Sequence, residues 1–339
     1  MADRDTRLNG FLSDTGWRHA KRSHIAGDAS NRRYDRLTRD DATTAILMDA
    51  PPELGEDVRP FCEMAEFLIS IGLSAPQIFH SDAENGFLII EDLGNDLFAR
   101  AIPNAPELET PLYAAATDVL SHLHAQQPPQ LTPFDCETMA DMVDLGFSWY
   151  ANGAGIDWQT PFEDFQALFP DLLSNYVAPP SVFMHRDYHA ENLLWLPGRA
   201  GVAQVGILDF QDAKLAHPAY DLVSMLQDAR RDVPADLEQA MIARYVTASG
   251  EDHTAFSTAY HVLGAQRNLR ILGVFARLCL HFGKPHYVDF IPRVYGLLMR
   301  DLAHPALTPV ADILRRTLPE PTSSVLKNLK DRCATFPTP

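Results

Sequence analysis

Three polar side chains in the middle of the chain have the types and the spacing for chemistry on a phosphate group. Asp187 and Asn192 stand five positions apart in a polar segment, and Asp209 ends the apolar run of Ile207 and Leu208. One carboxylate of such a set can accept the proton of a hydroxyl group. The second carboxylate and the amide oxygen suit a magnesium ion, which prefers oxygen ligands. The set therefore predicts transfer of a phosphoryl group to a hydroxyl, a reaction in which a protein mainly supplies position and neutralising charge.

The segment that carries the first of these carboxylates reads H-R-D-Y-H-A-E-N over residues 185–192. It matches the pattern H-R-D-x-x-x-x-N of kinase catalytic loops, in which the aspartate accepts the hydroxyl proton and the asparagine holds a metal ion. Short β-type runs at 191–196 and 204–209 predict a hairpin after this loop. We expect the hairpin to bring the three polar side chains to one edge of a cleft.

Two other interpretations of the same residues are weaker. Aspartate and asparagine favour turns and helix caps, so a single match to the pattern could be an ordinary loop. The second aspartate, at the end of an apolar strand and in the expected order, argues against that interpretation. A zinc site at His185 and His189 is rejected, because two ligands four residues apart need a helix and a third ligand, and the residues between them read as loop.

The first ninety or so residues combine short strands with one helix, and long helices follow. The expected strands lie at 32–37, 44–48, 77–80 and 87–91, and the expected helix at 59–70. Beyond residue 96 helical patterns dominate, at 112–126, 136–150, 162–176, 237–248 and 256–281. This order predicts an α+β fold of two lobes, with a ligand cleft where they meet. The predicted parts are a small β-rich N-terminal lobe at 1–91, a hinge at 92–96 and a larger, mostly helical C-terminal lobe at 97–339.

Composition and charge exclude several classes of protein. The 339 residues include 28 basic and 45 acidic side chains, and the formal net charge of −17 argues against a nucleic-acid binder with a basic face. The four cysteines form no C-x-x-C pair and are too widely spaced for a zinc site or a dense disulfide framework. No signal peptide and no apolar stretch of membrane length is visible. We expect a cytoplasmic protein that acts on a small molecule, with no membrane contact and no obligate protein partner.

Beyond these patterns, the chain resembles the aminoglycoside phosphotransferase-like superfamily, the small-molecule relatives of protein kinases, from residue 27 to about residue 300. Within it, the chain is similar to the bacterial anomeric kinases of N-acetylmuramate and N-acetylglucosamine. The segments that carry this likeness are G-D-A-S-N-R-R-Y at 27–34, A-I-L-M-D-A-P-P at 45–52, H-R-D-Y-H-A-E-N-L-L-W at 185–195 and Q-R-N-L-R-I-L-G-V-F-A-R-L at 266–278. The resemblance implies a two-lobed, protein-kinase-like fold. It also implies transfer of phosphate from ATP, with Mg²⁺, to the C1 hydroxyl of an amino sugar in peptidoglycan recycling.

The resemblance implies a role for each residue of the motif. Asp187 would be the catalytic base, and Asn192 and Asp209 would be the magnesium ligands. Asp209 takes the place of the aspartate in the protein-kinase motif D-F-G, although Gln211 replaces the glycine.

The resemblance also implies two segments that bind the nucleotide. Glu91 and Leu93 would meet the edge of the adenine through their backbone groups. A glycine-containing loop would lay its backbone N–H groups over the phosphates. Its residues are Gly27, Asp28, Ala29, Ser30, Asn31, Arg32 and Arg33.

One position departs from the pattern of the protein kinases. Those enzymes hold the α- and β-phosphates with a lysine on the third strand, paired to a helix glutamate. Here Met48 stands in the lysine's place, and no lysine occurs between Lys21 and Lys214. Arg32 or Arg33 could supply the missing charge, which we favour because the catalytic loop is intact. The alternative is an inert nucleotide-binding pseudokinase. Glutamates of the following helix would in either case have lost their usual partner.

A helix with three arginines offers a contact for the substrate. Arg267, Arg270 and Arg277 share one face of an otherwise apolar segment. An arginine fork suits a carboxylate, and N-acetylmuramate carries one, so Arg270 is a predicted substrate contact together with His189. The alternative is an amphipathic helix whose arginines pair with acidic neighbours. A kinase for another small alcohol or for an aminoglycoside is the alternative substrate class.

Overall fold

The computed structural model describes residues 2–25 and 31–337. The chain divides into two compact units, Met1–Gln126 with Ala190–Ala213, and Gln127–His189 with Lys214–Pro339. The first unit contains the larger sheet and the second is mostly helical. The predicted α+β class is confirmed. The first compact unit includes residues 97–126 and 190–213 together with the sheet. The lobe boundaries at residues 91 and 97 stay a prediction.

The first unit is built on a five-stranded antiparallel sheet with the strand order β1-β2-β3-β5-β4. All four strands expected in this region are present, and β1 at the edge was not expected. The strands are β1 (Lys21–Ile25), β2 (Arg33–Thr38), β3 (Thr44–Asp49), β4 (Ile78–Asp82) and β5 (Phe87–Ile90). Strand β5 lies between β3 and β4 and is buried throughout, as its sequence F-L-I-I indicates.

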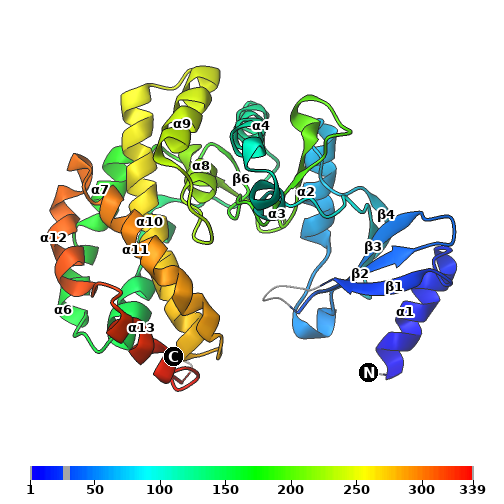
Figure 1. Cartoon of the computed structure of the whole chain (residues 1–339), viewed down its shortest axis with the longest axis horizontal. Coiled ribbons are helices and arrows are strands. Elements are labelled where there is room, and N and C mark those ends of the chain that lie inside the picture. The colour runs from blue at the N-terminus through cyan, green and yellow to red at the C-terminus, as the bar shows by residue number, and fades with distance from the viewer. Residues whose placement is uncertain (1, 26–30, 338–339) are drawn as a thin grey trace. The chain divides into compact units, whose positions relative to one another are not determined.

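One face of this sheet is closed by α1 (Ala2–Asp14), a helix that the sequence did not lead us to expect. Leu8, Phe11 and Leu12 of this helix form one buried cluster with Leu47 of β3 and Ile89 of β5. Figure 1 shows α1 lying along the sheet at the N-terminal end of the chain. Because side chains alternate along a strand, the opposite face belongs to the neighbouring residues of the same strands.

On that opposite face Tyr34, Met48 and Leu88 form a row across three strands, since Tyr34 pairs with Met48 and Met48 with Leu88. The rest of the unit consists of short elements from two parts of the chain. They are η1 (Pro52–Leu54), α2 (Arg59–Ser70), α3 (Phe98–Asn104), η2 (Pro106–Leu108), α4 (Glu109–His124), β7 (Leu193–Trp195), η4 (Gly201–Gln204) and β8 (Val205–Ile207). The pairing of β7 with β8 confirms the hairpin that the sequence predicts after the catalytic loop.

The second unit is organised around one long helix, α10 (His253–Leu280), against which α11 (Ile291–Asp301) lies (Figure 1). Two short strands, β6 (Val182–Met184) and β9 (Lys214–Ala216), pair antiparallel beside the catalytic loop. The other helices are α5 (Cys136–Asp141), α6 (Gln159–Gln166), α7 (Phe169–Tyr176), α8 (Ala219–Leu226), α9 (Ala235–Ser249), α12 (Thr308–Thr317) and α13 (Ser323–Asp331), with short 3₁₀ turns at Pro285–Phe290 and Pro305–Leu307.

Two of the expected helices are interrupted. The helix predicted over 136–150 is α5 followed by a π-helix, Gly146–Ala151. The helix predicted over 162–176 is split into α6 and α7, because Pro170 has no N–H to donate and begins a new helix at its second position. The sequence pattern shows only the apolar spacing, which continues across both breaks.

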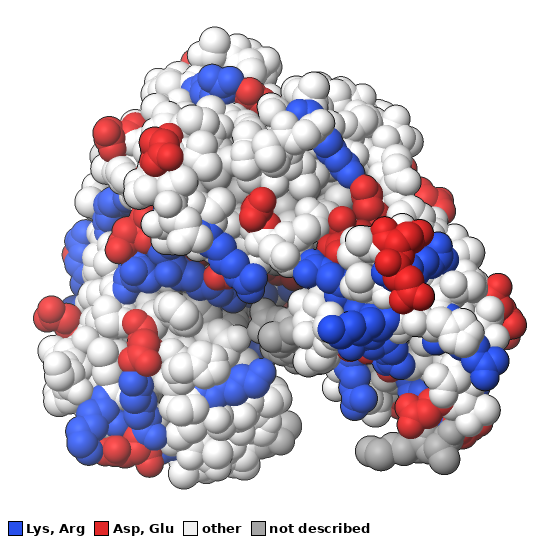
Figure 2. All heavy atoms as spheres, turned by 45° about the vertical axis from the view of Figure 1, so that its right-hand side comes forward, with Lys and Arg blue, Asp and Glu red and all other residues white. Residues whose placement is uncertain are grey.

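Charge and cysteine chemistry agree with the composition. Figure 2 shows acidic and basic side chains interspersed among uncharged ones on the face that it draws. All four cysteines are free thiols. Within residues 2–25 and 31–337, no helix is long and apolar enough to cross a membrane.

The crossing of α10 over the π-helix depends on a glycine. A Cβ at Gly273 would lie 2.0 Å from the backbone carbon of Leu145, and a neighbouring backbone cannot yield as a flexible side chain can. Gly273→Ala is therefore expected to lower the free energy of unfolding by about 1–3 kcal/mol through overpacking, measured by denaturant unfolding.

The matched control is Gly296→Ala in α11, where nothing lies within 4 Å of the added atom. There the gain in helix propensity is expected to raise stability by about 0.5–1 kcal/mol. Equal effects of the two substitutions would show that the close approach at Gly273 does not determine the packing of α10.

Candidate active site

The hairpin of the first unit places the two predicted magnesium ligands beside one another. The N–H of Leu208 donates to the carbonyl oxygen of Asn192 at 2.9 Å, so Asn192 lies across the hairpin from the residue before Asp209. Asp209 is exposed and has a φ of +63°, a left-handed conformation that non-glycine residues rarely adopt. Such conformations concentrate at functional sites. The oxygens of the carboxylate and the amide form a donor set that suits Mg²⁺.

The residues that follow hold Asp209 in this unusual conformation. Phe210 is buried and stacks on Phe61 of α2, with ring centroids 4.8 Å apart. Gln211, in the place of the expected glycine, donates from Nε2 to Oδ1 of Asp209 at 2.8 Å. An aromatic anchor and a side-chain amide therefore orient the carboxylate.

In the second unit, a buried carboxylate holds the catalytic loop in place. Asp221 of α8 accepts the N–H of His185 at 2.5 Å on one oxygen and the N–H of Arg186 at 2.9 Å on the other. Arg186 has a φ of +83°. Burial raises the pKa of Asp221 to about 6, against the opposing effect of His185 and the two N–H groups. Asp221 thus fixes the backbone immediately before Asp187, a role that the sequence analysis missed.

Asp187 itself is surrounded by positive charge. Burial alone would raise its pKa, but nearby positive charge, that of Arg267 first and also that of Arg186, outweighs burial and lowers it. Asp187 is therefore ionised at neutral pH, as a group that accepts and orients a hydroxyl proton must be. The N–H of His189 donates to the carbonyl of Asp187 at 3.1 Å and closes the turn between them.

His189 is buried beside Asp187 and is neutral. Burial lowers its pKa to about 4, although Asp228 favours the charged form. Its Nε2 accepts from Nη1 of Arg230 at 3.3 Å, because a guanidinium can only donate, so its proton is on Nδ1. That Nδ1 has no hydrogen-bond partner among the described residues. A buried donor without a partner is the kind of group that a substrate oxygen satisfies.

The arginines of α10 reach the same region. Arg267 donates from Nη2 to Oγ of Ser224 at 2.7 Å, while its Nη1 has no partner in the described part of the chain. Burial, with Arg186 and Arg267 nearby, lowers the pKa of Arg270, and Asp187 opposes this effect. Nε of Arg270 is also without a hydrogen-bond partner among these residues. The predicted contact Arg270 therefore lies in the electrostatic surroundings of Asp187.

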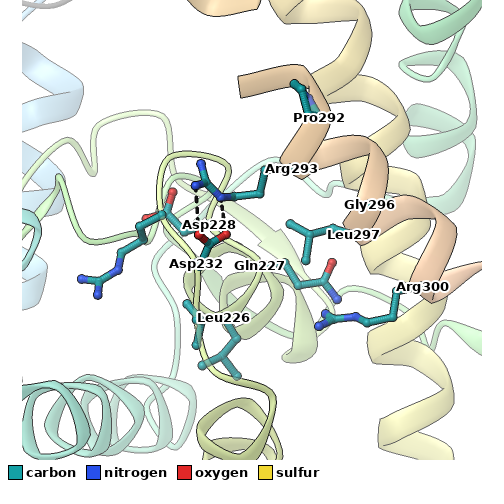
Figure 3. Close-up of a pocket in the computed structure, with 11 residues that line it drawn as sticks. Leu226, Gln227, Asp228, Asp232, Pro292, Arg293, Gly296, Leu297 and Arg300 are labelled. Atoms are coloured by element: carbon teal, nitrogen blue, oxygen red, sulfur yellow. Dashed lines mark hydrogen bonds and ion pairs between the residues drawn. The ribbon is translucent and has the colours of Figure 1, made fainter. Parts of the chain in front are cut away.

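A pocket of about 320 Å³, lined by charged and apolar side chains, lies in the same unit between the segment after α8 and one side of α11 (Figure 3). Arg293 crosses from α11 to Asp232, with Nε donating to Oδ1 at 2.6 Å and Nη2 to Oδ2 at 3.2 Å. Asp228 lines the pocket, and its Oδ1 accepts the N–H of Arg230 at 2.8 Å. Since Arg230 also contacts His189, one residue links the pocket wall to the catalytic loop.

The nucleotide loop is only partly described. Gly27, Asp28, Ala29 and Ser30 lie outside the described residues. Nε of Arg32 donates to Oε2 of Glu56 at 2.7 Å, and both side chains are largely buried, at 12% and 14% exposure. Arg33 and Asn31 are exposed. The carboxylate of this pair, Glu56, comes from the segment before α2.

Two arginines bind side chains in and beside the predicted hinge, Arg36 of β2 and Arg199 of the segment after β7. Arg36 of β2 binds Asp92, with Nε 2.7 Å from Oδ2, and Asn95 through Nη2 at 2.9 Å. The carboxylate of Glu91 accepts a hydrogen bond from Arg199. The backbone N–H of Glu91 donates to the carbonyl oxygen of Gln77 at 2.8 Å. These contacts fix the backbone of the hinge segment, which includes Leu93.

Comparison with known proteins agrees with these features. Residues 21–257 match the model of the phosphotransferase enzyme family. The chain belongs to this family. It is 39% identical over 360 residues to the N-acetylmuramate/N-acetylglucosamine kinase of Caulobacter vibrioides, across 95% of this chain and 98% of that protein. The kinase of the same name from Neisseria meningitidis is 32% identical, across 81% and 84%. The resemblance drawn from the sequence motifs is confirmed.

Solved structures share the fold at low sequence identity. The choline kinase LicA of Streptococcus pneumoniae matches 87% of this chain and 99% of its own, with a TM-score of 0.61 and 14% identity. The aminoglycoside phosphotransferase APH(2'')-Ib, with ADP bound, matches 88% and 96%, with a TM-score of 0.56 and 13% identity. The expected protein-kinase-like class of fold is confirmed.

The buried, neutral state of His189 predicts a pH dependence of stability. In the unfolded chain the imidazole takes up a proton near pH 6.5, whereas in the folded chain it does so only near pH 4. Stability is therefore expected to fall as the pH falls from 6.5 to 4, by up to about 3 kcal/mol from this residue.

Denaturant unfolding at pH 7 and pH 5 measures the effect. His189→Gln should lose less stability than the wild type between the two values, while the exposed His286→Gln controls for loss of an imidazole. If His189→Gln lost as much stability between pH 7 and pH 5 as the wild type does, His189 would not be held neutral by burial.

Proposed function

We propose that this chain is an ATP-dependent kinase that phosphorylates the anomeric (C1) hydroxyl of N-acetylmuramate or N-acetylglucosamine, in the recycling of cell-wall sugars. The observation that carries the proposal is the 39% identity, over nearly the full length of both chains, to a kinase named for these two sugars. The ionised Asp187 in an arginine-rich environment supports it, because phosphate transfer to an alcohol needs an acceptor for the hydroxyl proton.

In the proposed reaction, the C1 oxygen forms a bond to the γ-phosphorus of ATP as the bond from that phosphorus to the β,γ-bridging oxygen breaks. ADP leaves, and the proton of the C1 hydroxyl passes to Asp187. Asp187 orients the hydroxyl before transfer, and Asp221 keeps its loop in place through two backbone N–H groups.

The nucleotide would be held through the first unit. Asn192 and Asp209 are the proposed Mg²⁺ ligands, and a bound Mg²⁺ would neutralise charge on the phosphates. The backbone of Glu91 and Leu93 is proposed to meet the adenine. Hydrogen bonds from Arg36 and Arg199 hold this backbone segment in one conformation.

The arginines beside Asp187 favour an acceptor that carries a negative charge. Arg267 and Arg270 each have a guanidinium nitrogen without a hydrogen-bond partner in the described structure, and neither nitrogen is exposed to solvent. Unpaired N–H groups of this kind are costly unless a ligand satisfies them. The lactyl carboxylate of N-acetylmuramate is the group that we propose for Arg270, and a sugar oxygen is the group that we propose for Nδ1 of His189.

The proposal is tested by coupled release of ADP from Mg·ATP over a panel of acceptors, followed by phosphorus NMR of the product. The panel contains N-acetylmuramate, N-acetylglucosamine, glucose, choline, homoserine and kanamycin. A 1-phosphate of an N-acetyl sugar is the expected product. Turnover of choline or kanamycin alone would assign the chain another alcohol, and no turnover with ATP still bound would make it a pseudokinase.

Asp187→Asn removes the proton acceptor and should lower kcat by about 10²–10⁴-fold while leaving the affinity for ATP nearly unchanged. Steady-state kinetics and calorimetric titration with Mg·ATP measure the two quantities. A nearly normal kcat would remove Asp187 from the role of base.

Arg270→Ala should raise KM for N-acetylmuramate more than KM for N-acetylglucosamine, since only the first sugar has a carboxylate. A loss of one charge-assisted hydrogen bond corresponds to roughly a tenfold or larger difference. Arg277→Ala, two turns further along α10, is the matched control. Equal losses for the two sugars in Arg270→Ala would assign that arginine a structural role.

A further inference from the structure

The position of the strand lysine of protein kinases is occupied here by an apolar side chain, and a cation stands just before the neighbouring strand. Met48 of β3 is fully buried, and its cross-strand neighbour on β2 is Tyr34. Directly paired residues of an antiparallel sheet point to the same face. Arg32 precedes Tyr34 by two residues, and side chains two apart along an extended chain share a face. This alternation places Arg32, the residue just before β2, on the side of the sheet that Met48 faces.

Arg32 is held in this place by two neighbours. Glu56 accepts from Nε of Arg32 at 2.7 Å, and its other oxygen accepts the backbone N–H of Asn31 at 3.3 Å. The hydroxyl of Tyr34 is also hydrogen-bonded to Arg32. Burial disfavours the charge on Arg32, but these partners outweigh it and raise its pKa. A largely buried ion pair of this kind contributes little net stability, so its value lies in fixing the position of the charge.

The same cluster adjoins a proposed metal ligand. The charge of Asp209 acts on Tyr34, whose pKa burial raises and whose hydroxyl is therefore neutral. Tyr34 thus interacts electrostatically with both the guanidinium of Arg32 and the carboxylate of Asp209. Arg32, Tyr34, Glu56 and Asp209 all belong to the first unit. A cation close to the metal aspartate is where the phosphates of a nucleotide require positive charge.

We propose that Arg32, positioned by Glu56, binds the α- and β-phosphates of ATP in place of the strand lysine, and that the Arg32–Glu56 pair replaces the lysine–glutamate pair of protein kinases. An arginine can do both tasks at once, because its five N–H donors allow Nε to bind Glu56 while the Nη groups face a phosphate. The inference rests on the proposed use of ATP. Glu56 is a positioning residue, and Arg32 is the group that contacts the nucleotide.

The experiment measures nucleotide affinity without any acceptor sugar, so a wrong acceptor assignment does not affect it. Calorimetric titrations compare Mg·ATP with adenosine, which has no phosphates. Arg32→Met is expected to weaken Mg·ATP by about 10–100-fold and to leave adenosine unchanged, which also shows that the variant is folded. Arg22→Met is the matched control. It breaks another arginine–carboxylate pair of the sheet, with Asp35, and should change neither affinity.

Two further variants separate positioning from structure. Glu56→Gln should weaken Mg·ATP several-fold in the wild type and have no further effect in the Arg32→Met background, as a double-mutant cycle of a coupled pair requires. Met48→Lys in the Arg32→Met background should restore part of the lost affinity, because it returns a cation to the same face of the sheet.

An Arg32→Met variant that binds Mg·ATP as the wild type does would overturn the inference. So would parallel losses for ATP and adenosine, since these would assign the pair to the fold of the sheet. A wild type that binds adenosine and Mg·ATP equally would overturn both this inference and the proposed function. Acceptor turnover on an unexpected sugar would overturn only the acceptor assignment.

Discussion

The charge on Asp187 is the property on which the proposed chemistry depends. Burial alone would raise the pKa of this carboxylate, and nearby positive charge, that of Arg267 above all, lowers it instead. Arg267 comes from α10, whose position is set where Gly273 lets the helix approach the backbone of Leu145. The packing of the helical unit is therefore linked to the protonation state of one catalytic side chain. A well-packed helix can supply this link because protein interiors yield little to small displacements.

In the first unit, packing bears on the position of the cation Arg32. The helix α1 covers one face with apolar side chains, and on the other face Tyr34, with Arg32 two residues before it, pairs with Met48. With methionine in place of the strand lysine, position 48 carries no cation. Arg32 still supplies a cation on the side of the sheet that Met48 faces. Loss of a single expected residue type is thus weak evidence for an inert kinase when a neighbouring strand can present the same charge.

The sequence predicts most of the sheet and the catalytic loop, because period-two alternation and the motif around Asp187 are local patterns. It does not predict α1, whose contribution is to cover a sheet face formed by distant strands. It also does not reveal Asp221 or Glu56. Each carboxylate acts on a residue more than twenty positions away, and nothing in its own neighbourhood distinguishes it from a surface residue. Apolar spacing likewise continues through Pro170, which hides the break between two helices.

The most direct measurement is a crystal structure of the enzyme with Mg²⁺, a non-hydrolysable ATP analogue and N-acetylmuramate. The C1 hydroxyl is predicted to be the sugar oxygen within hydrogen-bond distance of the Asp187 carboxylate, roughly 2.6–3.2 Å, and in line with the γ-phosphate. A different hydroxyl of the sugar at Asp187, or a sugar bound away from this carboxylate altogether, would contradict the proposed function.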